Sequence, residues 1–104
     1  MEKRRHARKS IDLPVSFTVK GRSDHASGVG RDVSIGGMFI ETATAAPFNA
    51  ELTIRVQLRT ATGAMRDFDL PARVRWVRDG GMGVQFGLIG VHETHAITEL
   101  SRED

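Results

Sequence analysis

The sequence predicts an all-β fold, a small antiparallel barrel of about six strands followed by one C-terminal helix. Several stretches alternate apolar and polar residues with the period of two that buries one face of a strand and exposes the other. Short glycine-containing turn signals separate these stretches, and that spacing is typical of small barrels. The 104 residues can form one modest hydrophobic core but not two, so we expect a single domain.

The first half of the chain predicts three extended segments. Residues 13–20 alternate cleanly, and the turn-rich sequence GRSDH follows them. A second segment from Gly28 to Val33 leads through SIGG into a third, MFIE, with the break at the glycines. Residues 42–50 predict an irregular connection, because Pro47 does not suit a central strand.

The second half predicts three further strands. Residues 52–59 give the clearest alternation of the sequence, and a turn at 61–65 follows. The next strand places five apolar residues on one parity, which leads us to interpret Trp76 as core rather than as a stacking platform; these residues are Phe68, Leu70, Ala72, Val74 and Trp76. The Asp79-Gly80 pair predicts a hairpin turn into Met82, Val84 and Phe86.

The last residues lose the period of two and predict a short helix that packs against the body or closes an open end. Its expected apolar stripe consists of Val91, Ala96, Ile97 and Leu100. We therefore divide the single domain into a flexible N-terminal arm at 1–10, a barrel at 11–90, and a helix and tail at 91–104.

Composition and charge narrow the function classes. The chain has no cysteine, no apolar run of the ~18 residues that a membrane span needs, and no apolar block after its N-terminal charges. We expect a cytoplasmic protein without membrane insertion. Residues 1–9 carry a net charge of +4, whereas residues 10–104 carry −2, counted from the sequence. A basic arm on a slightly acidic body favours a compact anion or an acidic partner over a long nucleic acid.

Two polar constellations are candidates for a binding site. Arg4, Arg5 and Arg8 precede the first strand, and Asp32, Ser34, Gly36 and Gly37 lie at the break between the second and third segments. Taken singly, each has an ordinary explanation: the arginines could belong to a solvated tail, and residues 32–37 could form a simple turn. On an extended backbone, Asp32 and Ser34 would project to the same face, and Gly37 would allow a sharp turn or a close approach of ligand.

Together the two constellations have complementary chemistry. Arginine forks bind phosphate oxygens or the O6/N7 edge of guanine bidentately. A carboxylate at Asp32 can accept hydrogen bonds from the N1 and N2 hydrogens at the other edge of guanine. A ligand that contains both guanine and phosphate would use all of these groups.

At these residues the sequence resembles the PilZ family of bacterial receptors for cyclic di-GMP. RxxxR appears as Arg4 to Arg8, [D/N]xSxxG appears as Asp32 to Gly37, and ARVRWVRDGGMGVQFG is similar to the closing hairpin of the family. The resemblance implies a six-stranded PilZ-type barrel whose flexible N-terminal arm folds over the dinucleotide. It also implies that Arg4 and Arg8 contact guanine edges and phosphates, while Asp32, Ser34 and Gly37 line the surface that receives a guanine. Arg5 is either an accessory contact that stacks on a base or a solvent-facing charge, and Gly36 belongs to the same candidate ligand-binding set.

The expected function is that of a non-enzymatic receptor for cyclic di-GMP, which orders its arm and signals to a protein effector. The alternative is a PilZ-like adaptor that binds a protein without nucleotide; a nucleic-acid-binding barrel is a third hypothesis, weakened by the acidic body. In the family that the sequence resembles, the residue just before RxxxR influences whether one ligand or a stacked pair is held. Here that residue is Lys3, which has the charge of arginine without its planar fork, so the number of ligands stays open. Whether the chain is a monomer or a homodimer is also open.

We expect no catalytic residue, no metal site and no further cofactor. His92 and His95 stand at i and i+3 on the expected helix without a third ligand of the usual kind, so we interpret them as surface histidines.

Overall fold

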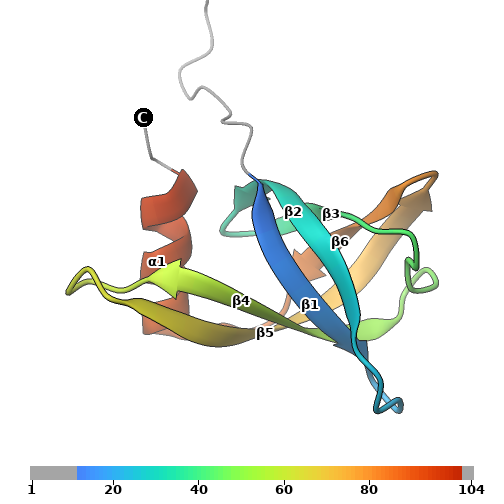
Figure 1. Cartoon of the computed structure of the whole chain (residues 1–104), viewed down its shortest axis with the longest axis horizontal. Coiled ribbons are helices and arrows are strands. Elements are labelled where there is room, and N and C mark those ends of the chain that lie inside the picture. Colours follow the sequence, from blue (N-terminus) through green and yellow to red (C-terminus); the bar gives the residue numbers. More distant parts are fainter. Residues whose placement is uncertain (1–11, 102–104) are drawn as a thin grey trace, which may run out of the picture.

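Six antiparallel strands close into a barrel, and one helix follows them (Figure 1). The structure is a computed structural model that describes residues 12–101. The elements are β1 (Leu13–Val19), β2 (Ala26–Ser34), β3 (Gly37–Glu41), β4 (Glu51–Arg59), β5 (Met65–Arg78), β6 (Gly81–Phe86) and α1 (Val91–Ser101). Around the barrel the strands follow the order β1-β2-β3-β6-β5-β4, with β4 pairing back to β1. The predicted fold class is confirmed.

The predicted alternation fills the barrel interior. In β4 every second residue is buried, and the same holds in β5 from Phe68 to Val74. The most deeply buried large side chains come from five strands and the helix: Phe17, Ile40, Ile54, Val56, Leu70, Val74, Met82 and Ile97. Each such side chain stabilises the fold by about 1.5–3 kcal/mol relative to an exposed one. The core is therefore a single cluster enclosed by the sheet.

The helix α1 lies across one end of the barrel (Figure 1). It packs against β2 and β4, which are separated by β1 in the ring, so it spans the mouth rather than lying along one strand. Ala96 and Ile97 are buried, and Leu100 packs against the core. The expected place of Val91 in this stripe is wrong, because at about 100° per residue it lies on the opposite side of the helix from Leu100 and is 80% exposed.

The hairpins and loops follow the predicted turn residues. Gly80 has a φ of 87° at the turn between β5 and β6, a conformation that glycine adopts without steric cost. Residues 42–50 run as a connection whose end pairs with β5, where Asn49 and Ala50 exchange backbone hydrogen bonds with Val74. Within residues 12–101, no helix is both long enough and apolar enough to cross a membrane.

Candidate functional site

The arginines predicted to bind the ligand lie outside the described residues. Arg4, Arg5 and Arg8 all precede Asp12, with which the described part of the chain begins. The Asp12 carboxylate is 2.9 Å from Nη1 of Arg31 on β2, and Nε of Arg31 is 3.1 Å from the Glu41 carboxylate on β3. These ion pairs hold the start of the barrel beside the strand that carries Asp32.

The corner between β2 and β3 is formed by Asp32, Ser34, Gly36 and Gly37, which we call the acidic corner. Its backbone differs from the expected extended one. Asp32 has a φ of 53°, and the pairing of β2 with β3 shifts register between Arg31 and Ser34. Aspartate tolerates this left-handed conformation better than most residues do. The bulge nevertheless leaves Asp32 and Ser34 on the lining of one hollow.

Part of the acidic corner serves the fold itself. The Ser34 hydroxyl accepts a hydrogen bond from the Gly36 N–H at 3.2 Å, the ordinary turn interaction of a serine. The Gly36 carbonyl accepts one from the Phe86 N–H at 2.9 Å, which ties the corner to the end of β6. A side chain at Gly37 would overlap the Val84 carbonyl, so the glycine is required by the close approach of β6. Gly36 is more open, since an added Cβ would meet only Ser34 Oγ, at 3.8 Å.

Trp76 does not belong to the core, and that part of the sequence interpretation is wrong. Val74 pairs with Val84, but Trp76 pairs with Gly83, so β5 uses two residues where β6 uses one. This β-bulge reverses the parity of β5 and turns the indole outward, where 44% of the residue is exposed. Gly83 has no side chain, and the ring occupies the space that a Cβ would fill there.

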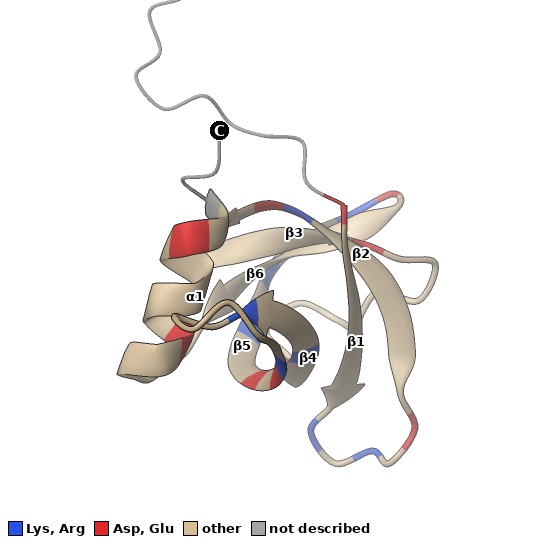
Figure 2. Cartoon of the chain, turned by 60° about the vertical axis from the view of Figure 1, so that its left-hand side comes forward, with Lys and Arg blue, Asp and Glu red and all other residues tan. Residues whose placement is uncertain are grey.

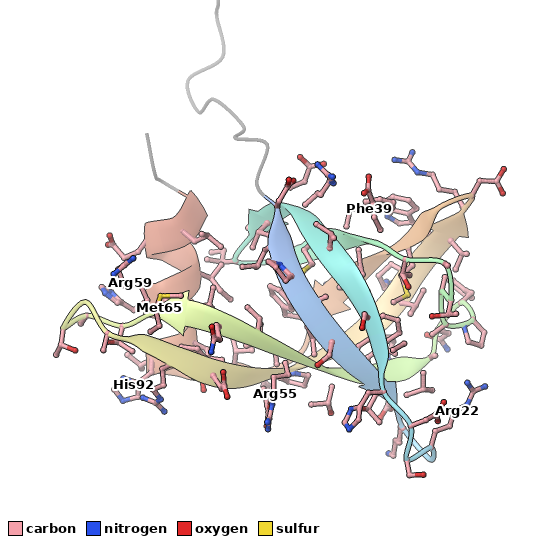
Figure 3. The ribbon with its side chains drawn as sticks, viewed as in Figure 1. Arg22, Phe39, Arg55, Arg59, Met65 and His92 are labelled. Atoms are coloured by element: carbon pink, nitrogen blue, oxygen red, sulfur yellow. The ribbon has the colours of Figure 1, made fainter. Side chains whose placement is uncertain are left out.

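The indole is one part of an aromatic shelf made by Phe39, Trp76 and Arg78. The two rings stack with centroids 5.4 Å apart and planes inclined by 16°. The Arg78 guanidinium carbon lies 4.9 Å from the Phe39 centroid and 5.0 Å from that of Trp76, within cation–π range. Figure 3 labels Phe39 on the outside of β3, whereas Trp76 and Arg78 both belong to β5.

The acidic corner and the aromatic shelf bound one hollow of about 450 Å³, which we call the ligand hollow. Its remaining lining includes Arg75, the extra residue of the bulge, and Gly83. A carboxylate, exposed aromatic surface and two guanidinium groups therefore surround the same space. Such a set can accept hydrogen bonds from a flat heterocycle, stack on its face and attract anionic groups attached to it.

Sequence reasoning missed the aromatic shelf because it assumed an unbroken alternation through Trp76. One signal was present in the sequence. Gly81 and Gly83 share a parity in β6, so that face of the strand carries no side chain between them and leaves room for a large ring from a neighbouring strand.

The histidines show no ligand arrangement. His92 and His95 are exposed on α1 and line a separate hollow with Arg66 and Phe68, well away from Phe39 (Figure 3). Among residues 12–101, no group of three or more His, Asp or Glu side chains could hold a metal ion.

Comparison with known proteins identifies one family and several solved structures of similar fold. The family model described as the PilZ domain matches residues 2–103. The chain is similar to the PilZ domain of CeSA from a cellulose-synthesizing bacterium, with a TM-score of 0.67 and 21% identity over 91% of this chain and 94% of that one. No curated protein matches the sequence.

The second similar structure is the inhibitor of motility MotI/DgrA from Bacillus subtilis. Its TM-score is 0.73 at 15% identity, over 97% of this chain and 50% of that one. The chain thus spans half the length of the Bacillus protein. At these identities both structures support the barrel fold.

Proposed function

The chain belongs to the PilZ domain family, and from this premise we propose that it is a receptor for cyclic di-GMP that signals to a protein effector. The observation that carries the proposal is the convergence of the acidic corner and the aromatic shelf on the ligand hollow. The family match also includes both constellations, since it extends from residue 2 to residue 103.

The ligand hollow offers a separate interaction to each part of a guanine nucleotide. The Asp32 carboxylate can accept hydrogen bonds from the N1 and N2 hydrogens of the base. The exposed indole of Trp76 can stack on its face, a contact worth about 1–3 kcal/mol per base in nucleic-acid-binding proteins. Arg75 and Arg78 add positive charge beside a ligand that carries about two negative charges.

The ion pair of Asp12 with Arg31 supports a role for the N-terminal arginines. It fixes the start of the barrel on β2, and the hollow extends from β2 across β3 and β6 to β5. Three strand spacings are about 14 Å, and the four residues from Arg8 to Asp12 also span about 14 Å when fully extended. Arg8 is therefore within reach of the whole hollow, and Arg4 has a longer reach.

In this mechanism the ligand recruits the arm. Residues 1–9 carry a net charge of +4, which is enough to neutralise the two phosphates while Arg4, Arg5 and Arg8 contact the dinucleotide. The closed arm then presents a new surface to the effector, so the second messenger acts by changing which part of the chain is ordered.

Calorimetry with cyclic di-GMP, GTP and single-stranded DNA tests the proposal. We expect micromolar or tighter binding of cyclic di-GMP alone, accompanied by a change in the emission of Trp76, the single tryptophan of the chain. Arg8→Ala should weaken binding about tenfold or more, since a bidentate arginine–guanine pair is worth about 1–3 kcal/mol.

Asp32→Gly is the matched change at the barrel, because glycine removes the carboxylate and still accepts the φ of 53°. Arg59→Ala is the control, because Arg59 lies at the far end of β4 and bonds to the Gly63 carbonyl. If cyclic di-GMP gives no heat, the nucleotide-independent adaptor is the better description. Equal heat from DNA would instead favour a nucleic-acid-binding barrel.

A further inference from the structure

A second hollow of about 580 Å³ lies on the outside of β1, β4, β5 and β6, and we call it the basic groove. One row of outward residues crosses all four strands. Glu51 pairs with Arg73 and Arg73 with Gln85, while the Lys20 N–H donates to the Glu51 carbonyl at the end of β1. A parallel row contains Thr18, Thr53 and Pro71.

The groove has more positive charge than its own carboxylate can neutralise. Lys20 Nζ is 3.2 Å and Arg73 Nη2 is 2.7 Å from the Glu51 carboxylate, and these two cations hold the pKa of Glu51 below its ordinary value. Arg22 and Arg75 also line the groove, and within residues 12–101 neither guanidinium is paired with a carboxylate. Figure 3 labels Arg22 in the loop that joins β1 to β2, and Figure 2 shows basic positions in that loop.

The floor of the groove is apolar and its walls can bond to a peptide. Pro71, Ala72 and Phe86 contribute to the lining, beside the hydroxyls of Thr18 and Thr53. Four strands span about 14 Å, the length of roughly four extended residues. An extended segment with carboxylates toward Arg22 and Arg75 and an aliphatic side chain toward Pro71 would match this lining.

We propose that the basic groove is a docking site for an acidic, extended segment of a partner protein. A nucleic acid fits less well, because Glu51 lies in the middle of the groove and residues 10–104 carry a net charge of −2. The groove binds its segment in the absence of nucleotide, so this proposal can be tested whether or not the chain binds cyclic di-GMP.

Fluorescence anisotropy with a labelled nine-residue peptide of alternating Glu and Val tests the docking site. The reference is the 104-residue chain with alanine at Arg4, Arg5 and Arg8, because these substitutions keep the other basic segment from competing for the peptide. Arg22→Glu and Arg75→Glu should each weaken binding about fivefold or more. Arg66→Glu is the matched control, since Arg66 lies on the same strand as Arg75 but lines a different hollow, and it should change the affinity less than twofold.

Amide chemical shifts locate the peptide. Expected changes fall on Thr53, Gln85 and Gly87, which line the groove. Equal losses from Arg66→Glu and Arg75→Glu, or shifts confined to other strands, would overturn the proposal. A peptide of alternating Lys and Val that binds as tightly as the Glu–Val peptide would also overturn the proposal. If an oligothymidylate binds at these residues more tightly than the Glu–Val peptide does, the groove is a nucleic-acid site instead.

Discussion

The contact between Gly83 and Trp76 is the most direct test of the aromatic shelf. A methyl group at Gly83 would lie closer than 3.0 Å to the indole, a separation that real Cβ atoms essentially never show. The indole is 44% exposed, so it can lift from β6 instead of forcing the strands apart. Gly83→Ala should therefore displace the ring while the barrel stays folded.

The cost of this displacement follows from the contacts that the ring loses. Its stack on Phe39 is worth about 0.5–1.5 kcal/mol and its contact with Arg78 about 0.5–1 kcal/mol. Part of this loss is offset, because alanine in a strand stabilises the folded state by about 0.5–1 kcal/mol relative to glycine. The net loss in the free energy of unfolding is about 1 kcal/mol, equivalent to a fall of roughly 4–8 °C in the thermal midpoint.

A double-mutant cycle isolates this contact. Urea unfolding followed by circular dichroism is compared for the wild type, Gly83→Ala, Trp76→Leu and the double variant. We expect a coupling energy of about 1–2.5 kcal/mol, the full value of the ring contacts, because Gly83→Ala has no ring to displace once Trp76 is gone and its gain over glycine is common to both backgrounds. Gly36→Ala is the matched control, since its Cβ would meet only Ser34 Oγ at 3.8 Å. A coupling below ~0.3 kcal/mol, with unchanged tryptophan emission in Gly83→Ala, would refute the shelf as described.

Three further predictions concern the acidic corner, the strand pair β4–β5 and the basic groove. Gly37→Ala should destabilise the free protein by about 1–3 kcal/mol in urea unfolding, because its methyl overlaps the Val84 carbonyl; unchanged stability would leave a ligand contact as the reason for the glycine. Arg55 donates hydrogen bonds of 2.8 and 3.0 Å to the Asp69 carboxylate and lowers the pKa of that carboxyl below its ordinary value of 3.8. The pair therefore stabilises the fold above pH 3.8, and this stabilisation is lost as the pH falls through the lower pKa of the folded state. The urea midpoint should then fall more steeply below about pH 4 in the wild type than in Asp69→Asn, and parallel curves would contradict this. Arg75 lines both the ligand hollow and the basic groove, so saturating cyclic di-GMP should weaken the Glu–Val peptide about fivefold in the anisotropy assay; an equal affinity would mean that the two sites are independent.

The sequence by itself determined the strands and their inward faces. Alternation in β1, β4 and the first part of β5 predicted which side chains fill the barrel, since a regular strand directs every second residue to one side. The Asp79-Gly80 turn and the buried Ala96 and Ile97 were predictable for a similar reason, because turn chemistry and helical periodicity are local properties.

Tertiary structure decided the ligand hollow. Trp76 faces outward and Asp32 has a positive φ because each follows or lies within a β-bulge, and a bulge depends on the pairing of two strands. Likewise, Gly37 and Gly83 are fixed by a carbonyl and a ring from other strands. Local sequence sets the direction of a side chain only while the strand stays regular, so the positions at which β2 and β5 bulge, and hence the groups that share a surface, emerge only once the barrel has closed.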